Sequence, residues 1–291
     1  MSSALKASQV DLSKITFSAP KTLDNGGKML FLNYGGGINP FYITLPEVEV
    51  PFDPMYFADN DTSGKYNIKI SLKDLESNNE LKCLHEKLGE LDTLLKEKAI
   101  ENSQQWFRKA KLSSDTINEL YTPLIKVATD PETGEPNGKW PDSFGFKVVK
   151  KDGKFPNFSI YDNSKPPVVF DVDGKTDTPV DLENVIMKGT LIKAVLKCNG
   201  VWIANGKFGC TWRAEQVRAK LPEGGLREFA IESDSDDSDD EVVDEKPVMI
   251  EDSDEDVHES EEEEEEVKEP EPEPGPKKKV RKLKVKKKSP E

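Results

Sequence analysis

The sequence predicts a mainly β protein with a helical insert, of the α+β class, followed by a disordered C-terminal tail. Short runs that alternate apolar and polar residues lie on both sides of one long segment whose leucines recur every three or four positions, a pattern typical of strands around a helix. All Trp, Tyr and Phe residues precede residue 231. Residues 231–291 hold few apolar side chains, too few to offset the conformational entropy lost on folding.

The N-terminal half begins with polar residues and continues into strands. Residues 1–25 show no periodicity, which predicts a flexible arm. Strands are expected over 28–34 and 41–45, on either side of three consecutive glycines. In the run 64–72 (GKYNIKISL), three apolar residues share one face, which predicts a half-buried strand.

A long amphipathic helix is expected within residues 78–110. Its apolar positions recur at spacings of three and four; they are Leu81, Leu84, Leu88, Leu91, Leu94 and Leu95. A Ser-Asp step at 114–115, ahead of further apolar residues, indicates the start of a second helix. Because the segment 130–142 is rich in turn residues, we place the helical insert at about residues 77–128.

Strand signals return after residue 142. Short runs (SFGFKVVK, NFSIYD and PPVVFDV) are bounded by turn residues. The strongest signal is GTLIKAVLKCNGVWIANGKFGCTWRAEQV over 189–217. Its Asn-Gly steps at 199–200 and 205–206 predict a meander of three strands, because Asn-Gly supplies the positive φ of tight hairpins. We therefore expect one domain over 26–230.

Catalytic and metal-binding constellations are missing from the sequence. His85 and His258 are the only histidines, and no Ser/His/Asp or Cys/His grouping accompanies them. Glycine clusters at 26–27 and 35–37 lack the Lys-Ser/Thr step of a phosphate loop. The Asp-Val-Asp-Gly step at 171–174 lacks the ligand ladder of a calcium loop and is interpreted as a turn. We therefore expect no enzyme activity, no cofactor and no metal site.

The cysteines and the apolar residues indicate the cell compartment. Cys83, Cys198 and Cys210 include no CxxC pair, which argues against a disulfide framework or a zinc ribbon. No run approaches the roughly 18 apolar residues of a membrane span, and no apolar secretory segment is visible. We expect an intracellular protein that is not secreted and has no membrane partner.

Two opposed charge blocks follow residue 230. Residues 231–275 contain 24 Asp/Glu and two Lys, a formal charge of −22. Residues 276–291 contain nine Lys/Arg and one Glu, a charge of +8. Since the whole chain carries −15, residues 1–230 carry about −1. The acidic run resembles a polynucleotide in charge density. This indicates either a partner protein that normally binds nucleic acid, or that residues 1–230 of this chain bind it.

Cations of the strongest β segment can gather on one side of a sheet. Lys193 and Lys197 alternate with apolar residues, and Lys207 and Arg213 share a face of the next run. Cations beside stacking rings on a small β-barrel are typical of unselective single-strand binding, and rings are plentiful over 140–161. The alternative is that the rings are core and the lysines a solvated face, which the nearly neutral body favours.

The order of elements resembles a known family. A strand over 64–72, a long helical insert, β runs that end in the 189–217 segment and an acidic tail are similar to the single-stranded DNA-binding proteins of short-tailed coliphages, whose relatives occur in large nucleocytoplasmic DNA viruses. The resemblance covers about residues 28–222 and rests on Gly189, Trp202, Gly206, Gln216 and the alternation of apolar residues with Lys. It implies an OB-fold-like barrel that binds single strands regardless of sequence.

The resemblance also implies groove residues and partners. By position, the groove residues are Lys193, Lys197, Trp202, Lys207 and Arg213. The implied function is protection of single-stranded DNA during replication or repair, with an acidic tail that competes for the groove and recruits replication proteins. A homodimer is a further option. One alternative is an acidic-tailed chaperone or assembly factor for basic proteins such as histones, and another is a viral structural protein with a passive body.

The basic end of the chain departs from the phage pattern. The phage tails end in acidic residues and an aromatic, whereas this chain ends in PKKKVRKLKVKKKSPE. This exposed cationic stretch resembles a nuclear import signal, formed by Lys277, Lys278, Lys279, Arg281 and Lys282. The alternatives are a tether to nucleic acid and an intramolecular partner for the acidic run. We expect the protein in the host nucleus or in a viral factory.

Overall fold

The computed structural model describes residues 4–23, 26–130 and 133–222. These described residues belong to one compact unit. The acidic run (231–275) and the predicted import signal (277–282) lie outside the described residues.

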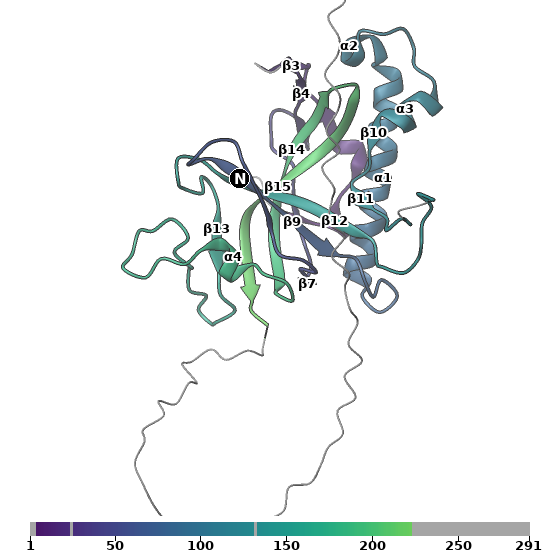
Figure 1. Cartoon of the computed structure of the whole chain (residues 1–291). Helices are drawn as coiled ribbons and strands as arrows, with labels where there is room; N and C mark the ends of the chain where they lie inside the picture. Colours follow the sequence, from purple (N-terminus) through teal and green to yellow (C-terminus); the bar gives the residue numbers. More distant parts are fainter. Residues whose placement is uncertain (1–3, 24–25, 131–132, 223–291) are drawn as a thin grey trace, which may run out of the picture. The chain divides into compact units, whose positions relative to one another are not determined.

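The centre of the fold is a long antiparallel hairpin (Figure 1). Its strands are β14 (Leu191–Ala204) and β15 (Lys207–Lys220), each of 14 residues. Asn205 and Gly206 join them with φ values of 50° and 73°, in the left-handed region that two-residue hairpin turns need. The hairpin predicted from this Asn-Gly step is confirmed.

The other Asn-Gly step forms no turn, so the predicted meander of three strands is wrong. Asn199 and Gly200 lie inside β14, where the register shifts by a bulge. Gly200 has a φ of 112°, and a Cβ atom there would lie 2.0 Å from the backbone oxygen of Leu30. The missing side chain lets β4 (Lys28–Leu30) pair closely with β14. This Asn-Gly step therefore bends a strand instead of ending it.

Short strands pair along both outer edges of the hairpin. Along β14 they are β7 (Val48–Glu49), β6 (Tyr42–Thr44) and β4. Along β15 they are β13 (Ser159–Tyr161), β12 (Ser143–Lys150) and β10 (Tyr121–Thr122), all parallel to it. The hairpin is therefore the spine of the sheet, and segments far apart in sequence meet on it.

The sheet extends outward from this spine. Beyond β12 lie β9 (Gly64–Ser71) and the edge strand β8 (Met55–Ala58), and beyond β6 lies β1 (Leu5–Lys6). β3 (Lys21–Thr22) and β11 (Ile125–Lys126) pair with β4 and β12, and β2 (Ile15–Phe17) pairs with β5 (Leu32–Tyr34) in a separate ladder. The order β1-β6-β14-β15-β12-β9-β8 is an open path, so within the described ranges the sheet is not closed.

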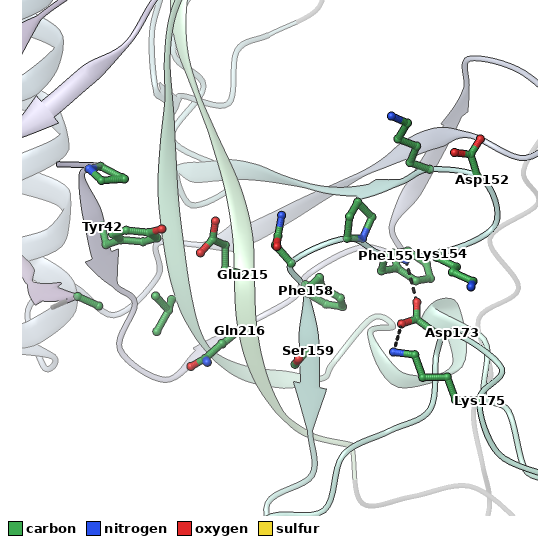
Figure 2. A pocket seen from close by; sticks show the side chains of 16 residues that line it. Tyr42, Asp152, Lys154, Phe155, Phe158, Ser159, Asp173, Lys175, Glu215 and Gln216 are labelled. Atoms are coloured by element: carbon green, nitrogen blue, oxygen red, sulfur yellow. Dashed lines mark hydrogen bonds and ion pairs between the residues drawn. The ribbon is translucent and has the colours of Figure 1, made fainter. Parts of the chain in front are cut away.

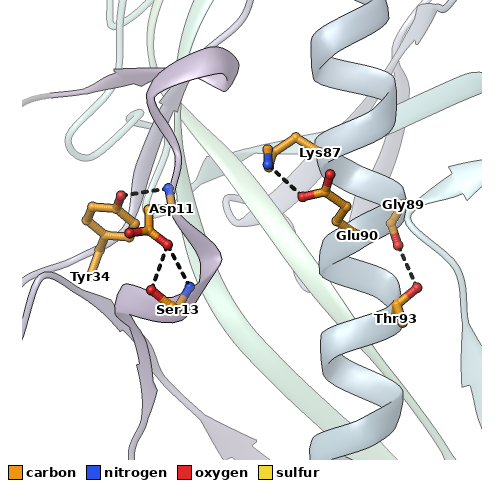
Figure 3. A network of polar contacts seen from close by, with 7 residues as sticks. All are labelled: Asp11, Ser13, Tyr34, Lys87, Gly89, Glu90 and Thr93. Atoms are coloured by element: carbon orange, nitrogen blue, oxygen red, sulfur yellow. Dashed lines mark hydrogen bonds and ion pairs between the residues drawn. The ribbon is translucent and has the colours of Figure 1, made fainter.

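Residues 4–22, expected to be a flexible arm, pack on the body instead. They form β1, η1 (Ala7–Gln9), η2 (Leu12–Lys14), β2 and β3. Ala7, Val10 and Ile15 are buried. In Figure 3, the Tyr34 hydroxyl accepts from the Asp11 amide at 2.9 Å, and Asp11 in turn accepts from the amide and hydroxyl of Ser13. The turns are too short to show a period in sequence, so their burial is decided by the elements they contact.

The helical insert confirms the predicted amphipathic pattern. It comprises α1 (Asn79–Glu101), α2 (Ser103–Phe107) and α3 (Ser114–Leu120); the short helix α4 (Leu182–Val185) lies outside it. The Asn78 side chain accepts from the Leu81 amide at 3.0 Å and so caps α1. The buried positions of α1 include Leu84, Leu88 and Leu91. The predicted fold class, mainly β with a helical insert, is therefore confirmed.

Large rings fill the core between this helix and the sheet. Trp212, Phe41, Phe144, Phe146 and Phe208 are almost fully buried. Several rings suggested by sequence for stacking are thus core residues, as the alternative interpretation held. Within the described residues, no helix is both long and apolar enough to cross a membrane.

Candidate nucleic-acid interface

Five strands contribute one in-register row of polar residues, which we call the cationic row. Its members are Tyr42 of β6, Lys197 of β14, Arg213 of β15, Lys147 of β12 and Asn67 of β9. In-register partners on neighbouring strands lie about 5 Å apart and project from the same face of a sheet. Each member is partly exposed, whereas its neighbours along the strand are buried. Three cations therefore lie side by side on the outer face.

One carboxylate lies beside two of these three cations. Glu215 is the extra residue of a bulge, because Leu196 pairs with Ala214 and Val195 with Gln216. Its Oε1 accepts from Arg213 Nη2 at 2.8 Å and lies 3.8 Å from Lys197 Nζ. The row therefore keeps a net positive charge.

Burial shapes the electrostatics of the row. It lowers the pKa of Lys147, and the nearby charge of Lys65 lowers it further. Burial also raises the pKa of Tyr42, assisted by the charge and hydrogen bonding of Glu215. Arg213 Nε is buried and has no hydrogen-bond partner within the described part of the chain. A buried donor without an acceptor is unfavourable for the free energy of folding.

A cleft of about 1200 Å³ opens beside the row. Figure 2 shows Tyr42, Glu215 and Gln216 on one wall and the 152–158 loop on the other. Lys151, Lys154 and Lys175 add positive charge. Asp173 offsets part of it, because its carboxylate accepts from Lys175 Nζ at 2.6 Å and from the Phe155 amide at 2.8 Å.

Half-exposed rings occur at two points of the face. Tyr42 is partly exposed, and Lys197 Nζ lies 5.6 Å from its ring centroid. Trp202 is also partly exposed, opposite Gly209 on β15. Phe155 and Phe158 line the cleft but are only 5% and 8% exposed. Tyr42 and Trp202 are therefore the rings that can receive a base by stacking.

All five groove residues implied by the family resemblance project from one face of the hairpin, but the structure brings only two into contact range. Lys197 and Arg213 are direct Cα partners. Lys193 lies opposite Arg218 and lines a different cavity with Lys6 and Glu80.

The remaining two predicted residues lie toward the hairpin turn. Trp202 lines a cavity that Lys147 also lines. Lys207 adjoins the turn, and its ammonium donates to the Glu119 carbonyl at 2.6 Å, at the end of α3. Lys207 therefore has a structural partner that the alternation of residues could not show.

Tyr42, Asn67 and Glu215 belong to this candidate interface although the sequence did not single them out, whereas Lys147 was noted only as a cation on a neighbouring run. Tyr42 and Lys147 occupy polar positions in strands that alternate polar and apolar residues. This local pattern predicts on which face of its strand each residue lies, but not which strands pair. Glu215 faces the cations only because of a bulge. In the described ranges, no group of three or more His, Cys, Asp or Glu is placed to hold a metal ion.

The described fold and face define a mainly β protein with a cationic sheet surface. No family model and no curated protein matches the sequence. Solved structures do align: gp2.5, a single-stranded DNA-binding protein encoded by bacteriophage T7, has 14% identity and a TM-score of 0.38, over 66% of this chain and 98% of that chain.

Further structural matches come from bacteriophage Enc34. Its single-stranded DNA-binding protein aligns with 10% identity and a TM-score of 0.37, over 76% of this chain and 98% of that chain. The same protein in complex with ssDNA aligns with 11% identity and a TM-score of 0.36, over 71% and 96%. Because these TM-scores lie below 0.5, the function proposed below rests on the residues of this chain.

Proposed function

We propose that the protein binds single-stranded DNA on the outer face of the β14–β15 hairpin, without enzymatic action. One observation carries this proposal: Lys197, Arg213 and Lys147 stand in register on three adjacent strands, with one carboxylate beside two of them. Phosphate contacts of Lys and Arg supply most of the affinity of sequence-independent binding. The remaining implied groove residues, Lys193 and Lys207, contribute less under this proposal.

The rings favour a single strand over a duplex. Tyr42 ends the row, and Trp202 lies farther along β14. Stacking on such rings needs unpaired bases, because paired bases present only their edges in the grooves. Stacking tolerates every base, which suits protection of single strands during replication or repair.

The charged tails fit this proposal as regulators. The acidic run of −22 would compete with DNA for the cationic row and attract replication proteins. The basic block at 277–282 would act as the import signal, with the nucleus or a viral factory as the destination.

The test is a titration of labelled oligo-dT by fluorescence anisotropy at low salt. We expect the full chain to bind, residues 1–230 to bind more tightly, and the affinity of both to fall steeply with salt. The absence of any binding by residues 1–230 at low salt would overturn the proposal.

A second candidate function is favoured by the density of the acidic run, which holds 24 Asp/Glu within residues 231–275. Under this reading the run itself binds basic proteins such as histones, and the β body is a scaffold. Deleting 231–275 separates the two candidates. It would abolish histone binding under the second and strengthen DNA binding under the first.

A further inference from the structure

A second cavity lies on the same face of the sheet, on the other side of the cationic row. Its volume is about 340 Å³, at the lower end of small-ligand pockets. Lys69, Lys126 and Lys147 line it, together with Trp202, Thr122 and Thr211. We call it the lysine pocket.

Strand pairing brings the three lysines together around β12. Lys126 of β11 is opposite Ser143, and Lys69 of β9 is opposite Gly145. Lys147 lies two residues farther along β12, on the same face. Since Ser143 and Gly145 carry little or no side chain, the space between the ammonium groups stays open.

No carboxylate of the described residues forms an ion pair with this cluster, although the charge of Asp59 acts on Lys147. Within the described part of the chain, Lys69, Lys126 and Lys147 form no ion pair. Asp92 is the acid that acts on Lys126, but its oxygens already accept from the Tyr121 hydroxyl at 2.5 Å and the Leu124 amide at 3.2 Å.

The pKa values agree with this geometry. Burial lowers the pKa of both Lys126 and Lys147, and the charge of Lys69 lowers that of Lys126 further. Three cations held close together without an ion-paired carboxylate favour a compact anion with several acceptor oxygens. The Thr122 and Thr211 hydroxyls add donors of the kind that bind phosphate.

We propose that the lysine pocket binds a phosphate group, and that its source is a backbone phosphodiester of the single strand bound on the cationic row. This inference rests on the proposed function. The pocket is continuous with the cationic row, because Lys147 belongs to both. This supports the bound strand as the source of the phosphate. A strand that follows the row past Lys147 enters the pocket beside the Trp202 ring, where the adjoining base can stack.

The test compares two double variants of the full chain. Lys69→Gln/Lys126→Gln removes two pocket cations and leaves the row intact. Lys111→Gln/Lys188→Gln removes two exposed lysines that line neither cavity, so it matches the first in charge. Both are titrated with 5′-hydroxyl oligo-dT over a range of NaCl concentrations, and circular dichroism checks that each is folded.

We expect the pocket variant to lose about 0.7 in the slope of log K against log salt, the loss for one phosphate contact, and the control to keep the wild-type slope. Equal slopes for the two variants would overturn phosphate binding in the lysine pocket and leave the proposed function intact. If wild type itself did not bind, the proposed function would fail instead. A loss seen only with 5′-phosphorylated oligo-dT would support a phosphate site but overturn the backbone as its source.

Discussion

Lys197 and Arg213 are Cα partners across β14 and β15, and one oxygen of Glu215 contacts both side chains. Like charges directly opposite each other destabilise a sheet, so this pair persists because a bulge turns a carboxylate toward it. Under the proposed function, a phosphate replaces Glu215 at the same donors, and this exchange links the stability of the sheet to its affinity for an anion.

Removing either cation of the pair weakens binding and reduces its salt dependence. We expect Arg213→Gln and Lys197→Gln each to lower the slope of log K against log salt by about 0.7. Anisotropy titrations with oligo-dT measure this slope, with Lys111→Gln as the control of equal charge. Wild-type slopes in both row variants would contradict a strand that crosses the row.

Glu215→Gln separates binding from stability. Without the carboxylate, the donors of Arg213 and Lys197 are open to phosphate, so we expect tighter binding of oligo-dT. The opposed cations then repel, and we expect the free energy of unfolding to fall by about 0.5 kcal/mol. Urea denaturation and anisotropy measure the two effects. Weaker binding by this variant would show that Glu215 orders the cations instead of competing for them.

Tyr42→Ala tests base stacking at the end of the row. Loss of the ring is expected to cost about 1–2 kcal/mol of binding free energy, roughly a tenfold weaker affinity. The salt slope stays unchanged because no cation is removed. Tyr42→Phe keeps the ring and is the matched control, expected to bind within about twofold of wild type. If Phe and Ala weakened binding equally, the hydroxyl and not the ring would be the contact.

Gly200→Ala tests the close approach of β4 to the hairpin. A Cβ atom at Gly200 would lie 2.0 Å from the Leu30 oxygen, whereas at Gly206 it would meet no atom within 4 Å. Both glycines have positive φ. We therefore expect Gly200→Ala to lower the free energy of unfolding by about 2–4 kcal/mol and Gly206→Ala by about 1 kcal/mol. If urea denaturation showed the same loss of unfolding free energy for both variants, the positive φ, and not the contact with Leu30, would account for it.

The sequence by itself determined the elements whose pattern repeats locally. The leucines of α1 lie on one face because a helix turns every 3.6 residues, and alternation located β9, β12, β14 and β15 because the pleat has a period of two. Asn205-Gly206 specified the hairpin through its backbone preference. Alternation also put Lys197 and Arg213 on the polar faces of their own strands, before any pairing was known.

Only the tertiary structure decided which strands lie side by side. Tyr42, Asn67, Lys147 and Arg213 come from four distant parts of the chain, and no local period encodes their register. The same Asn-Gly dipeptide forms a turn at 205–206 and a bulge at 199–200, because only the latter has the backbone of Leu30 packed against it. The face could be foreseen from local geometry, whereas the cationic row arises from long-range pairing.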